Sequence, residues 1–159
     1  NNTNQVIIDP LPVLITPVKT PKRRLMLGEA DFSFAKAWLS KQLEKTKNNE
    51  LGKFLTATEY RKREHLIKDY ALTFKKNEDF LKQYNVQLEC GVDATKIHEK
   101  YKGKKFSRIH FNFPHDGSSY NKGSLPPIIA KFFESAAQLQ DIGDCIYMAI
   151  PHHPSEHKN

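Results

Sequence analysis

A short loop that contains two carboxylates follows an apolar run near the start of the chain. The run Arg24–Leu27 ends at Gly28. The loop consists of Gly28, Glu29, Ala30, Asp31, Phe32, Ser33 and Phe34. Gly28 permits a tight turn, and the small side chain of Ala30 lets the backbone approach a ligand. A loop at this place predicts a binding site, because ligands of open α/β sheets bind beyond the carboxyl ends of the strands.

The charges of this loop restrict what it could bind. A dinucleotide fingerprint needs the pattern G-x-G-x-x-G, and the loop lacks its second and third glycines. Glu29 and Asp31 would also repel a pyrophosphate at the N-terminus of the following helix. They are compatible with a ligand that bears an ammonium and a sulfonium, such as S-adenosylmethionine. In an alternative interpretation the segment is only a strand-to-helix turn that Asp31 or Ser33 caps, and the spacing alone favours neither.

Strand-like and helix-like patterns alternate along the rest of the chain. Short apolar runs predict strands at Arg24–Leu27, Phe54–Thr58, Val86–Cys90, Phe106–Phe111 and Cys145–Ile150. The last predicted helix should bury Ile128, Ile129, Phe132, Phe133, Ala136 and Leu139. Strands separated by helices predict a doubly wound, mostly parallel sheet of the Rossmann-like α/β class in a single domain. The pattern is consistent with a domain truncated after the fifth strand.

The two ends of the chain differ from this pattern. Residues 1–22 are rich in Asn and Pro, which predicts an extended N-terminal arm or linker with one short strand at 13–15. Residues 23–150 form the predicted domain, and residues 151–159 form a C-terminal tail. The tail contains the zinc pattern H-x-x-E-H at 153–157, but Pro154 disfavours the helix that this pattern requires. We therefore assign no residue to a metal.

Composition limits the classes of protein to consider. The chain has 159 residues, a formal net charge of +7 and a pI of about 9.3. Such a charge favours binding to nucleic acid, although an ordinary lysine-rich surface explains it equally well. No apolar run approaches the roughly 20 residues that span a bilayer, and no signal peptide is recognisable. Cys90 and Cys145 lie in apolar, strand-like contexts, which indicates reduced core residues and an intracellular protein. We expect a cytoplasmic location, or a nucleolar one if the protein is eukaryotic.

Four segments in order resemble one family of enzymes. They are G-E-A-D-F-S-F at 28–34, T-A-T-E-Y at 56–60, G-V-D-A-T-K-I at 91–97 and F-N-F-P-H at 111–115. From about Arg23 to Ile150, the chain resembles the Rossmann-like methyltransferase family that includes the eukaryotic large-subunit ribosomal RNA uridine-N(3) methyltransferases. The resemblance implies a class I methyltransferase fold and S-adenosylmethionine-dependent methylation of a nucleobase nitrogen, uridine N3, of ribosomal RNA. A non-catalytic binding or regulatory domain and a methyltransferase with a non-RNA substrate are the alternatives.

The resemblance also implies which residues hold the cofactor. Gly28 through Phe34 would form the cofactor loop. Asp93 and Ala94, after the third strand, would lie beside the adenine. Glu59, after the second strand, is the candidate for holding the ribose hydroxyls.

The chain departs from the family at two of these places. Ala30 stands where the family usually has Gly, which would tighten the approach of the loop to the cofactor. Glu59, Tyr60 and Arg61 stand where the family tends to have Ser-Tyr-Asp, which puts the ribose contact in question. Arg61 is interpreted here as a surface residue rather than a ligand.

The fourth segment contains the candidate acceptor residues Asn112, Phe113, Pro114 and His115. It resembles a variant of the Asn-Pro-Pro-aromatic segment of N-methyltransferases, which would hold the acceptor base. The Asn112 amide can hydrogen-bond a nucleobase edge, and Phe113 can offer a stacking face. His115 could accept a proton or position the base, although a loop histidine bonded to backbone is an equally good interpretation.

Overall fold

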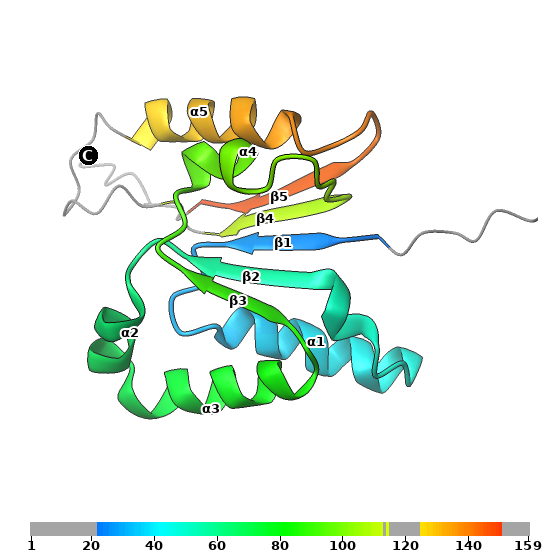
Figure 1. Ribbon diagram of the computed structural model, residues 1–159, viewed down its shortest axis with the longest axis vertical. Helices are drawn as coiled ribbons and strands as arrows, with labels where there is room; N and C mark the ends of the chain where they lie inside the picture. Colours follow the sequence, from blue (N-terminus) through cyan, green and yellow to red (C-terminus); the bar gives the residue numbers. More distant parts are fainter. Residues whose placement is uncertain (1–21, 113, 115–124, 151–159) are drawn as a thin grey trace, which may run out of the picture.

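A single parallel sheet organises the part of the chain that the structure describes. The computed structural model describes residues 22–112, 114 and 125–150. Its strands are β1 (Arg24–Leu27), β2 (Leu55–Glu59), β3 (Gln87–Cys90), β4 (Arg108–Asn112) and β5 (Cys145–Ala149). The five strands lie in the order β3-β2-β1-β4-β5 (Figure 1). Because β1 pairs with both β2 and β4, the strand order reverses beside β1, where open α/β sheets bind their ligands.

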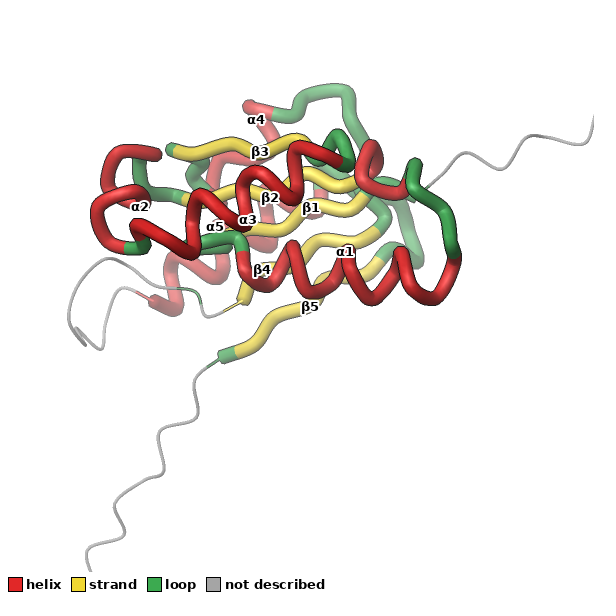
Figure 2. The backbone as a smooth tube through the Cα atoms, turned by 90° about the horizontal axis from the view of Figure 1, so that it is seen from below, coloured by secondary structure: helices red, strands yellow, loops and turns green. Residues whose placement is uncertain are grey.

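Helices cover both faces of this sheet. On one face lie α1 (Ser33–Thr46), α2 (Arg63–Asp69) and α3 (Ala71–Gln83), and α1 and α3 run side by side across it (Figure 2). On the other face lie α4 (Ile97–Lys100) and α5 (Leu125–Ala137). Two 3-10 turns, η1 (Leu51–Phe54) and η2 (Ala94–Lys96), precede β2 and α4. The arrangement confirms the predicted Rossmann-like α/β fold.

Strand β1 explains why the sequence folds this way. Leu25 and Leu27 pack toward α5, whereas Met26 packs toward α1. All three side chains are buried, as expected of a parallel strand that is covered on both faces. Full burial of one such side chain stabilises the fold by roughly 1.5–3 kcal/mol. The central strand thus ties both helical layers together and fixes the start of the loop at Gly28.

The structure corrects three sequence-based expectations. Phe133 is 44% exposed, because neighbouring positions on α5 point about 100° apart and Phe132 takes the place against the sheet. Cys90 and Cys145 are free thiols, as predicted, but both are only partly buried. No helix was predicted at 94–100, where the structure has η2 and α4. The proposed strand at 13–15 and the tail pattern at 153–157 lie outside the described residues. Within those residues, no helix has the length and apolar character needed to cross a bilayer.

Candidate functional site

A cavity of about 750 Å³ opens at the carboxyl ends of β1, β2, β3 and β4. Its volume is within the range of small-molecule and cofactor sites, roughly 300–1,000 Å³. The predicted site residues that line it are Gly28, Ala30, Glu59, Asp93, Ala94 and Asn112. These residues come from each of the four segments that carry the family resemblance. The fold therefore brings together, around one cavity, positions that lie up to 84 residues apart in the sequence.

The loop after β1 enters this cavity through its backbone. Gly28 has φ +70°, and Ala30 has φ +50°, so both lie in the left-handed region. A side chain at Gly28 would have room, since its Cβ would be 3.5 Å from the Phe111 ring, but the backbone would be strained. The Glu29 N–H donates to the Thr58 carbonyl at 3.0 Å, which holds the loop to β2.

The two loop carboxylates bind the start of α1. Glu29 Oε2 accepts from the Ala35 N–H at 2.9 Å, and Asp31 Oδ1 accepts from the Ser33 N–H at 3.1 Å. Burial, opposed by the bond from Ala35 and reinforced by Glu59 and Asp31, raises the pKa of Glu29 to about 8. Among the residues that the structure describes, neither Glu29 nor Asp31 lines the cavity. Both carboxyl groups thus accept backbone N–H groups from the first turn of α1. Their predicted contact with a cationic ligand stays a prediction, as does any contact from Phe32, Ser33 or Phe34.

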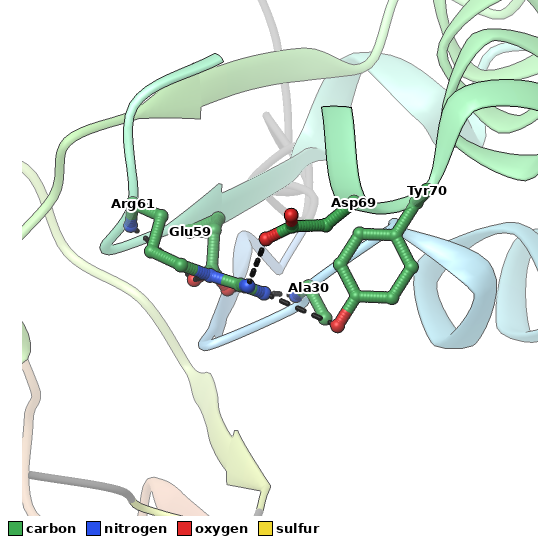
Figure 3. Close-up of polar contacts among 5 residues, drawn as sticks. All are labelled: Ala30, Glu59, Arg61, Asp69 and Tyr70. Carbon is green, nitrogen blue, oxygen red and sulfur yellow. Dashed lines mark hydrogen bonds and ion pairs between the residues drawn. The ribbon is translucent and has the colours of Figure 1, made fainter. Parts of the chain in front are cut away.

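Glu59, the last residue of β2, connects the loop to the neighbouring strand exit (Figure 3). Its side chain is buried, with only 6% of the residue exposed. Glu59 Oε2 accepts from the Ala30 N–H at 2.7 Å. Glu59 Oε1 accepts from both the backbone N–H and the Nε–H of Arg61, at 3.3 and 3.1 Å. The Glu59 side chain therefore joins the loop after β1 to the segment after β2.

Arg61, interpreted from the sequence as a surface residue rather than a ligand, has a partly exposed side chain in a network of hydrogen bonds. Its side chain lines the cavity, and its guanidinium lies 5.3 Å from the centre of the Tyr70 ring. Nη2 donates to the Tyr70 hydroxyl and Nη1 to Asp69 Oδ2, both at 3.3 Å (Figure 3). These contacts fix the planar group against the end of α2. The wall of the cavity beside Glu59 is thus a network of bonded side chains.

Backbone hydrogen bonds join the segments that follow the carboxyl ends of β2 and β3. The Gly91 N–H donates to the Arg61 carbonyl at 3.1 Å, and the Val92 N–H donates to the Glu59 carbonyl at 3.0 Å. These bonds bring Asp93 to the cavity next to the Glu59 wall. Asp93 Oδ1 accepts from the N–H and the hydroxyl of Thr95, at 2.8 and 2.7 Å, so it caps η2 through one oxygen.

The acceptor candidates are described in part. Asn112, the last residue of β4, is half-buried and lines the cavity. Pro114 is buried, and Phe113 and His115 lie outside the described residues.

Sequence reasoning did not single out several residues that line the cavity. They include Tyr60, Tyr70, Ile128 and Lys131. Tyr60 is 67% exposed, and its place directly after Glu59 was a usable signal. Lys131 lines the cavity from α5, which covers the face of the sheet opposite α1. No local sequence pattern indicates this place.

Comparisons with known proteins agree with the geometry. Residues 25–158 match the BMT5-like family model, described as rRNA (uridine-N3-)-methyltransferase BTM5-like. The human ferredoxin-fold anticodon-binding domain-containing protein 1 is 32% identical over 121 residues, or 75% of this chain and 18% of the relative. Its mouse homologue is 33% identical over 121 residues, with the same coverage. The Saccharomyces cerevisiae 25S rRNA (uridine(2634)-N(3))-methyltransferase is 25% identical over 151 residues, or 79% of this chain and 43% of the relative. The chain spans less than half the length of each of these relatives.

Proposed function

Because the chain belongs to the BMT5-like family of rRNA (uridine-N3-)-methyltransferases, we propose that it methylates a nucleobase nitrogen of ribosomal RNA, uridine N3, with S-adenosylmethionine as cofactor. The observation that supports this most strongly is the cavity that joins Gly28, Glu59, Asp93 and Asn112. The first three residues form the cofactor half in this proposal. Asn112 marks the acceptor half, at the end of the adjacent strand.

The groups around the cavity suit the different parts of the cofactor. Glu59 already accepts three hydrogen bonds, but its two oxygens offer about four acceptor sites, so room remains for a ribose hydroxyl. The ring of Tyr60 gives a flat apolar face for the adenine. Asp93 bonds Thr95 through Oδ1, which leaves Oδ2 to accept from an exocyclic amino group. Gly28 and Ala30 let the backbone lie close to the ligand.

The described residues would act mainly by position. When bound, S-adenosylmethionine supplies a methyl group activated by its sulfonium. Asn112 would hydrogen-bond the uracil edge and hold N3 in line with that methyl group, so that proximity and orientation lower the barrier. Lys131 would stabilise negative charge on the uracil as N3 loses its proton, because a cation in a partly enclosed site favours an anionic acceptor. A proton-accepting role for His115 stays a prediction.

Two measurements on the full chain test this function. Calorimetry should show binding of S-adenosylmethionine and of its demethylated product, S-adenosylhomocysteine. Incubation with ribosomal RNA and the cofactor, followed by mass spectrometry of the nucleosides, should show 3-methyluridine. Absence of cofactor binding would contradict the proposal as a whole. Binding without any methylated nucleoside would leave a cofactor-binding domain that does not catalyse transfer to RNA.

A further inference from the structure

Ala30 adopts a backbone conformation that its side chain disfavours. Its φ of +50° lies in the left-handed region, where a Cβ atom crowds the following carbonyl oxygen. Glycine would adopt this conformation freely, whereas alanine needs neighbouring contacts to hold it there. Ala30 also lines the cavity, so the direction of its peptide groups sets the shape of the ligand site. Something in the surrounding structure must therefore stabilise this turn.

The side-chain contact to the Ala30 peptide itself comes from Glu59. The Ala30 N–H donates to Glu59 Oε2 at 2.7 Å, a short bond to a charged acceptor. Such a bond constrains the Ala30 peptide only if the carboxylate itself is fixed. Glu59 lies at the end of β2, and its other oxygen accepts the backbone N–H and the Nε–H of Arg61.

Arg61 is in turn fixed by α2. Its guanidinium bonds Asp69 and the Tyr70 hydroxyl and lies over the Tyr70 ring (Figure 3). A planar guanidinium can serve three acceptors in fixed directions, which a lysine ammonium cannot do in the same geometry. The chain of contacts runs from α2 through Arg61 and Glu59 to the strained peptide of Ala30.

We propose that Arg61 is a positioning residue for the cofactor loop: by holding the Glu59 carboxylate, it holds Ala30 in the left-handed conformation that gives the site its shape. This inference rests on the proposed function for the identity of the ligand. Arg61 acts here through Glu59 and Ala30 and needs no contact of its own with the ligand. The proposal therefore predicts that Arg61 matters less when residue 30 can adopt a positive φ unaided.

A double-mutant cycle tests this coupling. Binding of S-adenosylhomocysteine is measured by calorimetry for the wild type, Arg61→Met, Ala30→Gly and the double variant. We expect Arg61→Met to raise Kd about tenfold when residue 30 is alanine, and no more than about threefold when it is glycine, a coupling typical of residues in one contact network. An equal loss in both backgrounds would overturn the proposal, because it would mean that Arg61 acts on the ligand directly or on the fold in general.

Thermal unfolding of the same four proteins without ligand gives a second readout. Arg61→Met should lower Tm more in the alanine background than in the glycine background. If the wild type fails to bind the cofactor product but this coupling is present, the positioning role stands and the proposed function fails. If the wild type binds and neither readout shows coupling, the positioning role fails and the proposed function stands.

Two further variants complete the design. Arg61→Lys keeps the charge but loses the planar donors, so it should resemble Arg61→Met more than the wild type. If Arg61→Met does not fold, Arg61→Lys takes its place in both the calorimetric and the thermal-unfolding measurements. Lys68→Met removes an exposed positive charge from α2, the helix that follows Arg61, and should leave Kd unchanged. A loss in Lys68→Met equal to that in Arg61→Met would overturn the proposal in favour of a general charge effect.

Discussion

At the scale of single residues, Asp93 and Asn112 separate the two tasks proposed for the cavity. Both line it, but Asp93 follows β3 and Asn112 ends β4, on opposite sides of the loop after β1. Changing each side chain should therefore affect a different measurement.

Replacing Asp93 should weaken cofactor binding. Asp93→Asn keeps a side-chain oxygen for Thr95, so the cap of η2 is preserved while the charge is lost. Loss of a charged hydrogen bond to the adenine should raise the Kd of S-adenosylmethionine about tenfold, since such bonds contribute about 1.5–3 kcal/mol. Calorimetry provides the measurement, and Asp79→Asn, an exposed change on α3, is the control. Equal affinities of the Asp93 and Asp79 variants would remove Asp93 from the cofactor site.

Replacing Asn112 should spare cofactor binding and slow methyl transfer. Asn112→Ala removes the amide proposed to orient the acceptor, so we expect a Kd within about twofold of wild type. The rate of transfer to ribosomal RNA should fall about tenfold to a hundredfold, because misplacement of a reacting group has effects of that size. Single-turnover assays measure the rate, with the exposed Asn49→Ala as control. A matching loss of cofactor affinity would assign Asn112 to the cofactor instead.

The sequence alone predicted several of the residues that line this cavity. The loop from Gly28 could be predicted because it directly follows the carboxyl end of a strand, where parallel sheets bind ligands, whereas Glu59 and Asp93 were predicted through the family resemblance of their segments. Arg61 could not, because its place in the cavity wall depends on Asp69 and Tyr70, which the fold brings next to it.

At the scale of elements, the spacing of apolar residues predicts a helix or strand best where one face, or the whole element, is buried. Strands β1 and β5 are short apolar runs, and α1 repeats its apolar residues at helical spacing, so their types were predictable. Helix α4 has only four residues, of which Ile97 alone is apolar, so no period could reveal it. The middle of helix α3 is polar, so an apolar period could not show which side chains it buries, and Asn77 and Glu78 are buried there by tertiary contacts.

Glu29, which accepts a hydrogen bond from the first turn of α1, should make the stability of the fold depend on pH. A folded-state pKa of about 8, above the ordinary value of 4.5, means that the native protein binds more protons than the unfolded chain between these pH values. Stability should therefore fall as pH rises through this window. His110, whose pKa burial and Arg24 lower to about 4, has the opposite effect below pH 6.5, so the clean window is from 6.5 to 8.

Glu29→Gln should flatten this dependence. The glutamine oxygen still accepts from the Ala35 N–H, but no proton is lost as the pH rises. In thermal unfolding, the wild-type Tm should fall between pH 6.5 and 8, and the variant should be several degrees more stable at pH 8. Each pH unit changes the free energy of unfolding by at most about 1.4 kcal/mol for one group. Parallel Tm curves for the two proteins would show that Glu29 is ionised already at the lower pH.

At the scale of the whole molecule, the charge of the chain bears on its proposed substrate. A net charge of +7 attracts RNA phosphates, and each phosphate that is neutralised releases counterions. RNA affinity should therefore fall steeply with salt, with a slope of about −0.7 per contact for single strands on logarithmic axes. Binding of S-adenosylhomocysteine in the cavity should change little over the same range. Filter binding between about 50 and 200 mM KCl, a range over which such contacts lose much of their affinity, would test this. RNA affinity that does not depend on salt would argue against a phosphate-contacting substrate.

The left-handed turn at Ala30 also bears on how this loop can change over evolutionary time. While residue 30 is glycine, positions 59 and 61 can vary without disturbing the turn, because glycine needs no support there. Once alanine is present, losing Arg61 exposes the strain that Glu59 otherwise offsets. Under the proposed role of Arg61, acceptance of alanine at position 30 would depend on which residues stand at positions 59 and 61, and a later loss of Arg61 would be harmful. Through the buried Glu59 carboxylate, the effect of a substitution at position 61 would depend on whether residue 30 is glycine or alanine. Such a dependence is epistasis, and it makes the order of the two substitutions matter.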